Sequence, residues 1–272
     1  MALTRMGSNG NMRRQFVGIV PAAGLGMRLR PFRYPKELLP VLFTPESANN
    51  SDTSTRPMLA AEYSLLAMQG AGIHRVLVIV ADWKLEIVRC LGSGKALGVE
   101  LAYINQEEPR GLADAVNSSF AWIIDESVCL CLPDSVFQPV TAVKSLCSYI
   151  DETKADLALG VFPTTEPQHL GPVSFAADGA VEEVLEKPVS GTLRNTWGIA
   201  VWRPRFSRFL NDTLAGDCCC EISLGEVFNR AVKAGLDVRA LYFPDGRYLD
   251  IGRMNTLTSL FVDISPGSLI TI

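Results

Sequence analysis

The first residues that could do chemistry form a loop of small side chains after an apolar run. Residues 16–20, Phe-Val-Gly-Ile-Val, predict a buried strand, and Arg28 and Lys36 lie downstream. Between them are the small residues Ala22, Ala23, Gly24 and Gly26. Because these residues leave the backbone accessible, a polyphosphate can accept hydrogen bonds from successive N–H groups there. A solvated glycine-rich turn followed by basic residues would give the same pattern.

The spacing of this loop differs from two common nucleotide-binding loops. A P-loop ends in Gly-Lys-Ser or Gly-Lys-Thr, which this segment lacks. A dinucleotide fingerprint needs a third glycine where Leu29 stands. The loop is therefore of neither kind.

Two aspartates follow apolar segments and could bind a metal. Asp134 comes just after the apolar segment 127–132, and Asp250 follows Tyr248 and Leu249. A carboxylate at the end of a buried strand is costly without a partner, and a hard cation such as Mg²⁺ would compensate it. From the residues alone, each aspartate could equally cap a turn.

Two further polar segments could bind substrates. Residues 106–116 join a strand end to a helix start, where open α/β sheets bind ligands, and the Gln106 amide could read a nucleobase edge. Glu186 and Lys187 follow another apolar strand, and by themselves could be an exposed ion pair of little energetic value.

The first half of the chain alternates strand and helix patterns. Strands are predicted at 76–81, 99–104 and 127–132, and helices at 57–69, 82–91 and 112–123. Apolar strands alternating with amphipathic helices predict an α/β fold with a doubly wound, mostly parallel, Rossmann-like sheet covered on both faces.

The second half has a different pattern. Strands are predicted at 156–162, 173–176, 180–187 and 195–202, with few helices between them and a turn at Asp178-Gly179. A last helix is predicted near residues 221–234. We therefore expect hairpins and a mixed β lobe.

These segments together resemble the sugar-1-phosphate nucleotidylyltransferases. Residues 23–31 and 35–41 are similar to the family's small-Gly-x-Gly-x-Arg-Leu-x-Pro and Pro-Lys-x-Leu-Leu-Pro-Val signatures. The segments containing Gln106, Asp134, Glu186 and Asp250 follow in the family's order. Pro133 and Ile251 depart from the glycine and threonine usual in the family.

The resemblance implies that a pyrimidine nucleoside triphosphate reacts with a phosphorylated acceptor, a sugar 1-phosphate above all, and that pyrophosphate leaves. It implies that Mg²⁺ binds Asp134 and Asp250. The implied catalytic residues are Arg28, Lys36, Asp134, Lys187 and Asp250. The implied nucleotide-binding residues are Ala22, Ala23, Gly24, Gly26, Met27, Gln106, Pro109 and Gly111. The implied acceptor-binding residues are Gly171, Glu186, Lys187, Trp197, Gly198 and Glu221.

Two other functions fit the same residues. One is a cytidylyltransferase of the same fold acting on a non-sugar phosphate or a phosphonate. The other is a catalytically silent regulatory paralogue that binds nucleotide sugars. Arg28, Lys36, Asp134, Lys187 and Asp250 together argue against the silent paralogue, because binding alone does not require all five.

Composition limits the partners and the compartment. A net charge of −4 over 272 residues gives no electrostatic reason to expect a nucleic acid or an anionic membrane. A polar leader, residues 1–14, has no apolar core, so the expected compartment is the cytoplasm. We expect one domain over 15–272, with a nucleotide-binding half at 15–150 and an acceptor-binding half at 151–272. A homo-oligomer is compatible with the resemblance.

Overall fold

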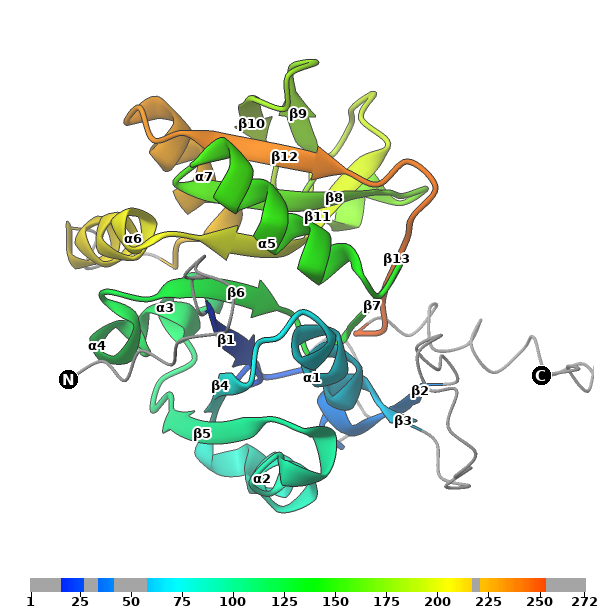
Figure 1. Cartoon of the computed structure of the whole chain (residues 1–272), viewed down its shortest axis with the longest axis vertical. Coiled ribbons are helices and arrows are strands. Elements are labelled where there is room, and N and C mark those ends of the chain that lie inside the picture. The colour runs from blue at the N-terminus through cyan, green and yellow to red at the C-terminus, as the bar shows by residue number, and fades with distance from the viewer. Residues whose placement is uncertain (1–15, 27–33, 42–57, 217–220, 253–272) are drawn as a thin grey trace, which may run out of the picture.

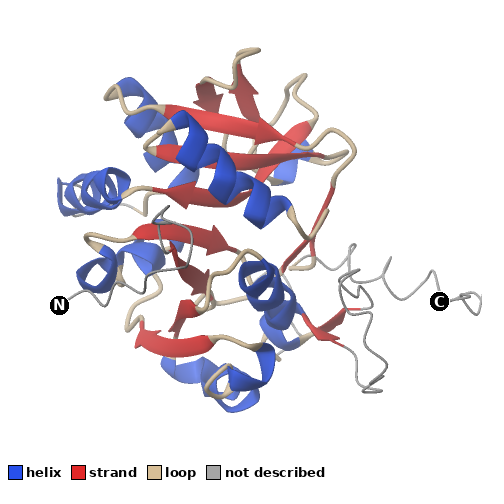
Figure 2. Ribbon diagram, in the orientation of Figure 1, coloured by secondary structure: helices blue, strands red, loops and turns tan. Residues whose placement is uncertain are grey.

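The computed structural model gives the arrangement of most of the chain (Figures 1 and 2). It describes residues 16–26, 34–41, 58–216 and 221–252. Of the predicted site residues, Met27 and Arg28 lie outside the described part, and so do the loop at 42–56 and the cysteines at 218–220.

One sheet of seven strands spans both halves of the chain, in the order β12-β8-β11-β6-β1-β4-β5. Its strands are β1 (Phe16–Pro21), β4 (Arg75–Val80), β5 (Glu100–Asn105), β6 (Ser127–Cys131), β8 (Leu157–Pro163), β11 (Asn195–Trp202) and β12 (Val238–Tyr242). Only β11 runs antiparallel to its two neighbours in this sheet, and the other pairs are parallel. The predicted mostly parallel α/β fold is confirmed, and the strands of the second half extend the same sheet.

The interior strand β1, between β6 and β4, is buried on both faces because its apolar residues alternate between two cores. Phe16 and Val20 belong to one hydrophobic cluster, whereas Val17 and Ile19 belong to the other. Gly18 lets a helix approach closely, since an added Cβ would come within 2.6 Å of the Met68 sulfur. β1 is thereby held rigidly, and its carboxyl end carries the small-residue loop.

The helices cover the sheet on both faces (Figure 2). They are α1 (Ala60–Gly70), α2 (Leu85–Leu91), α3 (Leu112–Asn117), α4 (Phe120–Ile123), α5 (Ala142–Thr153), α6 (Pro204–Gly216) and α7 (Leu224–Lys233). Short 3₁₀ helices occur at η2 (Lys36–Leu38), η3 (Asp82–Lys84), η4 (Lys95–Leu97) and η5 (Pro167–His169). None of the helices in the described ranges has the length and apolar character of a bilayer span.

Two helix predictions need correction. The predicted helix 112–123 is interrupted at Ser118 and Ser119, whose hydroxyls donate to the carbonyls of Ala115 and Val116 at 2.7 and 2.6 Å. Side-chain hydroxyls that bond to nearby carbonyls compete with regular helix geometry. Two further helices were not predicted, α5 at the boundary between the halves and α6 in the second half, and each buries one apolar face.

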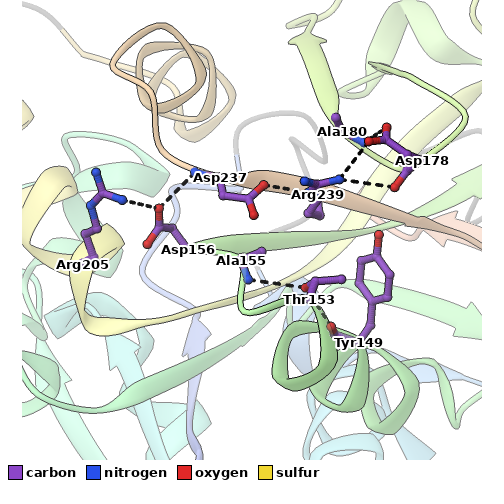
Figure 3. Close-up of polar contacts among 9 residues, drawn as sticks. All are labelled: Tyr149, Thr153, Ala155, Asp156, Asp178, Ala180, Arg205, Asp237 and Arg239. Carbon is purple, nitrogen blue, oxygen red and sulfur yellow. Dashed lines mark hydrogen bonds and ion pairs between the residues drawn. The ribbon is translucent and has the colours of Figure 1, made fainter.

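The second half adds a hairpin beside the sheet. β9 (Val173–Phe175) and β10 (Val181–Val184) pair antiparallel across the predicted turn at Asp178-Gly179. Arg239 of β12 donates to Asp178 at 3.2 Å and to Asp237 at 2.6 Å. Both contacts are drawn as dashed lines in Figure 3. These bonds anchor the hairpin turn to β12.

Besides the β9–β10 hairpin, two short ribbons lie outside the main sheet. β7 (Ser135–Gln138) pairs antiparallel with β13 (Arg247–Asp250), and β2 (Pro40–Val41) pairs with β3 (Met58–Leu59). The β7–β13 ribbon joins a segment from the first half to one near the end of the described chain (Figure 1). Asp250 is paired with Ser135, the residue directly after Asp134, so this register brings the two predicted metal ligands together.

Candidate active site

Three predicted catalytic side chains converge on Gly252. The nearest atoms to a Cβ added there are Asp134 Oδ2 at 2.8 Å, Asp250 Oδ1 at 2.9 Å and Lys36 Nζ at 3.0 Å. Lys36 Nζ also forms an ion pair with Asp134 Oδ2. Lys36 and Asp134 therefore belong to one cluster although they lie 98 residues apart along the chain.

Backbone hydrogen bonds hold this cluster in place. The N–H of Ile251 donates to the carbonyl of Asp134 at 2.9 Å, and the N–H of Gly252 donates to Asp250 Oδ1 at 2.8 Å. The side chain of Ile251 is fully buried. The contact between the two segments thus uses the backbone of residue 251, and the family's threonine hydroxyl is not needed for it.

The cluster keeps Lys36 protonated. Burial alone would lower the pKa of Lys36, but attraction to Asp134, Glu37 and Asp250 outweighs burial and raises the pKa above its ordinary value. Lys36 is therefore cationic at neutral pH and available to neutralise an anionic substrate.

The two aspartates fit a magnesium ion that is completed by substrate. Among the described residues there is no group of three or more His, Cys, Asp or Glu side chains suited to hold a metal. Mg²⁺ commonly takes only one or two carboxylates, with waters and substrate phosphates as its other ligands. The convergence of Asp134 and Asp250 at Gly252 provides two such oxygen ligands.

The small-residue loop begins at the end of β1 and is open toward its ligand side. The N–H of Ala22 donates to Ile79 of β4 at 2.7 Å, which fixes the base of the loop. Farther along, a Cβ added to Gly24 or Gly26 would meet no atom within 4 Å. Gly26 has φ +62°, a conformation that glycine adopts without strain. The described part of the loop thus leaves room for a ligand to approach its backbone.

A buried ion pair, which no sequence pattern indicates, lies next to the small-residue loop. Lys84 Nζ donates to Glu37 Oε1 at 2.7 Å and to the carbonyl of Ala22 at 3.0 Å. Glu37 comes directly after Lys36. Glu37 lies in the short 3₁₀ helix η2, and a helix this short has no apolar periodicity from which its burial could be predicted.

The predicted base-reading segment is also held by a contact that the sequence did not indicate. Gln106 is buried, and its Nε2 donates to Asp114 Oδ2 at 2.6 Å. Asp114 thereby fixes which end of the amide is the donor. Gly111 has φ +93° and directly precedes α3, and Pro109 is exposed in the loop between Gln106 and Gly111.

Gly111, predicted to bind the nucleotide, lies close to Glu221, predicted to bind the acceptor. A Cβ added to Gly111 would come within 2.5 Å of Glu221 Oε1. A Cβ on Gly198 would likewise come within 2.5 Å of the Tyr248 ring, two residues before Asp250. Glycine at both positions allows segments of the second half to pack closely against the catalytic segments.

Backbone hydrogen bonds join the segment 170–171 to Lys187 and to Trp197. The N–H of Lys187 donates to Leu170 at 2.9 Å, and the N–H of Trp197 donates to Gly171 at 3.0 Å. Lys187 has φ +44°, which is unusual for a residue with a side chain and is typical of constrained functional positions. Glu186 and Lys187 form an ion pair at 3.0 Å and keep 40% and 60% of their side chains exposed.

Trp197 contributes mainly to packing. Its side chain is buried and packs edge-on against Phe228. A Cβ on Gly171 would lie 2.3 Å from the indole Nε1, so the indole occupies the space beside that glycine. Trp202, at the end of the same strand, is fully buried and belongs to the core. Direct acceptor contact by Trp197 stays a prediction.

A cavity of about 1090 Å³ lies beside the aspartate cluster. Its lining includes Tyr248, Leu249 and Asp250 on one side and Leu170 and Arg194 on another. Glu186 and Lys187 are not part of its lining. The cavity therefore reaches one predicted metal ligand, Asp250, but neither Asp134 nor the predicted acceptor ion pair.

The chain belongs to the nucleotidyl transferase family, whose model matches residues 17–266. The match confirms the resemblance to sugar-1-phosphate nucleotidylyltransferases that the sequence motifs indicated, because several relatives are enzymes of that kind.

Two relatives illustrate this similarity. A glucose-1-phosphate thymidylyltransferase of Mycolicibacterium smegmatis is 33% identical over 63% of this chain and 55% of that protein. A low-salt glycan biosynthesis nucleotidyltransferase of Haloferax volcanii is 29% identical over 63% of this chain and 44% of that protein. The chain thus spans about half the length of the curated relatives it matches.

Solved structures share the fold at lower identity. A UTP-bound UGPase from Acinetobacter baumannii superposes with a TM-score of 0.71, at 19% identity, over 93% of this chain and 95% of that chain. This likeness supports the α/β fold assigned above.

Proposed function

We propose that the protein transfers a nucleotidyl group from a pyrimidine nucleoside triphosphate to a sugar 1-phosphate, giving a nucleotide sugar and pyrophosphate. The observation that carries this proposal is the convergence of Lys36, Asp134 and Asp250 on Gly252. The main barrier to nucleotidyl transfer is the negative charge of the polyphosphate. A neighbouring ammonium, and a cation bound by two carboxylates, would offset that charge.

The reaction needs no covalent enzyme intermediate. An oxygen of the acceptor phosphate attacks the α-phosphorus in line, the new P–O bond forms, and the bond to the bridging oxygen of pyrophosphate breaks. Lys36 would neutralise the polyphosphate, and Arg28 would assist from the loop that follows Gly26. Bound at Asp134 and Asp250, Mg²⁺ would supply further charge neutralisation. Catalysis would then consist of positioning and electrostatic stabilisation.

The base would be read by Gln106. Since Asp114 holds Nε2 at 2.6 Å, the amide presents its donor and acceptor in one fixed order. Uracil and thymine present a carbonyl and an N–H along the edge where cytosine presents an amino group and a bare nitrogen. A fixed amide can match only one of these orders, and we assign it to uracil and thymine, in keeping with the thymidylyl-transferring relatives.

The acceptor would bind in the second half of the chain. Lys187 is exposed beside Glu186 and could bind the acceptor phosphate, while Glu186 could accept hydrogen bonds from sugar hydroxyls. The cavity that begins at Asp250 would give the acceptor room next to the aspartate cluster. In this scheme residues 15–150 bind the nucleotide and residues 151–272 bind the acceptor within one domain.

Pyrophosphate release with Mg²⁺ tests the proposal. UTP, dTTP, CTP, ATP and GTP would each be combined with several sugar 1-phosphates, alditol phosphates and phosphonates. We expect release with UTP or dTTP and one sugar 1-phosphate. Release only with CTP and a non-sugar acceptor, or no release from folded protein that binds a nucleotide sugar, would contradict it.

A further inference from the structure

The pair Lys84–Glu37 lies outside the set of groups that would touch substrate, yet it joins three segments of the nucleotide side. The side chains of Lys84 and Glu37 are 6% and 1% exposed. Lys84 belongs to η3, just after β4, and Glu37 to η2, while the Ala22 carbonyl that Lys84 also binds belongs to the loop after β1. One buried ammonium therefore connects the base of the small-residue loop to the segment that carries Lys36.

Stability alone does not account for this pair. A buried ion pair is often no more stabilising than apolar residues of the same size, because both charges lose their hydration. Burial raises the pKa of Glu37 above its ordinary value, although the charges of Lys84 and Lys36 oppose that shift. Glu37 Oε2 is buried and has no hydrogen-bond partner in the described part of the chain. The desolvation of Glu37 is thus only partly compensated.

The Lys84–Glu37 pair is connected both to the backbone of the small-residue loop and to Lys36. Ala22 is bound from two sides, by its N–H to Ile79 at 2.7 Å and by its carbonyl to Lys84 at 3.0 Å. Glu37 is the residue next to Lys36, which contacts Asp134. A shift of Lys84 would therefore be transmitted both to the loop backbone and to the Lys36–Asp134 contact.

We propose that Lys84 is a positioning residue for the nucleoside triphosphate, which acts through Glu37 on Lys36 and through the Ala22 carbonyl on the small-residue loop. Lys84 is not placed to touch the substrate, because its side chain is only 6% exposed and its ammonium donates to Glu37 and to the Ala22 carbonyl. Its effect is to hold the loop N–H groups and the Lys36 ammonium in a fixed relation. This inference rests on the proposed function for the identity of its ligand.

A double replacement separates positioning from stability. Lys84→Met combined with Glu37→Leu removes both charges and leaves apolar side chains of similar size, so the melting temperature should fall only as far as the lost hydrogen bond to the Ala22 carbonyl requires. Misplacement of reacting groups by about 1 Å costs on the order of 100-fold in rate. We therefore expect kcat/KM for UTP or dTTP to fall about 100-fold, the Kd for UTP to rise, and the KM for the acceptor to change little.

Three further variants complete the design. Lys144→Met removes an exposed lysine of α5 and should leave all values unchanged. Lys84→Arg keeps a buried cationic donor and should retain more nucleotide affinity than Lys84→Met. If the double variant does not fold, the comparison of Lys84→Arg with Lys84→Met at a temperature where both are folded decides the question.

The outcomes distinguish the inference from the proposed function. A double variant that is folded and has the wild-type kcat/KM and Kd for UTP would overturn the positioning role while leaving the function intact. A wild-type protein that releases no pyrophosphate would overturn the function, and its Kd for UTP against that of the double variant would still test the role of Lys84.

Discussion

The nucleotide side and the acceptor side of the proposed site hold their charged groups in different ways. On the nucleotide side, Lys36 and Asp134 are 14% and 12% exposed at the side chain, and each is tied to other segments. On the acceptor side, Glu186 and Lys187 are neighbours in sequence and keep 40% and 60% exposure. Buried charges are organised before substrate arrives, whereas exposed charges can adapt to what binds.

This difference predicts different kinetic effects. Removal of a buried, multiply bonded charge should reduce the rate of the chemical step, because its position is part of the transition-state environment. Removal of an exposed charge should weaken the binding of one substrate. The following predictions, from the largest effect to the smallest, test that contrast.

The largest effect is expected for Asp134→Asn and Asp250→Asn. Each removes one of the two carboxylates at Gly252, and turnover should fall about 100- to 1000-fold, the size of the loss for a single electrostatic group in other enzymes. Steady-state kinetics at saturating Mg²⁺ would measure it. Asp125→Asn, at a side chain that is 81% exposed, is the matched control. Near-normal Mg²⁺-dependent turnover in Asp134→Asn would remove Asp134 from the metal site.

A smaller effect, on one substrate only, is expected for Lys187→Met. A hydrogen bond to a charged group contributes about 1.5–3 kcal/mol, so the KM for the sugar 1-phosphate should rise about 10- to 100-fold. The KM for the nucleotide should not change, because Lys187 lies on the acceptor side. A loss of turnover as large as in Asp134→Asn, with unchanged acceptor KM, would mean that the two sides do not differ as described.

Asp114→Ala should weaken base selection. Without the 2.6 Å bond to Asp114, the Gln106 amide can turn over and present its donor and acceptor in either order. The ratio of kcat/KM for UTP to that for CTP should fall about tenfold, the discrimination expected of one hydrogen bond of about 1.4 kcal/mol. Melting curves would check that α3 is intact. An unchanged ratio would show that Asp114 does not set the orientation of the base-reading amide.

The smallest kinetic effect is expected far from both substrates. Asp156 Oδ2 accepts from Arg205 at 2.8 Å and from the backbone N–H of Asp237 at 3.0 Å (Figure 3). Asp156→Ala should lower the free energy of unfolding by about 1–3 kcal/mol, because the Asp237 N–H loses its partner. Urea denaturation would measure this loss. The KM values for the nucleotide and for the acceptor should both stay within about twofold of the wild-type values. A change in either KM would extend the site into this network.

The sequence was sufficient to predict the mostly parallel sheet, and it named Asp134 and Asp250, whose role in metal binding stays a prediction. Apolar strands and the helices between them produce a periodic pattern, and the sheet follows from it. Asp134 and Asp250 were singled out because each follows an apolar segment, and the family resemblance, not their position alone, favoured metal binding over a turn cap. Their meeting at Gly252 depends on the β7–β13 register, which joins residues more than 100 positions apart and leaves no local signal.

Other features could not be predicted for related reasons. Lys84 and Glu37 look like ordinary surface residues of short helical turns, and only the tertiary fold buries them against each other. The break between α3 and α4 depends on two serine hydroxyls that donate to nearby backbone carbonyls. The apolar residues on both sides keep helical spacing, so their pattern does not indicate the break. The burial of Trp197 depends on Gly171, which lies 26 residues earlier and leaves space for the indole.

The central claim is that the acceptor phosphate attacks the α-phosphorus of the nucleotide at the Lys36–Asp134–Asp250 cluster. The most direct test supplies a sugar 1-phosphate labelled with ¹⁸O in its phosphate, together with UTP or dTTP and Mg²⁺, and follows the label by ³¹P NMR. The account predicts that the label stays in the nucleotide sugar, including its bridging oxygen, and that the released pyrophosphate is unlabelled. Label in the pyrophosphate would contradict it.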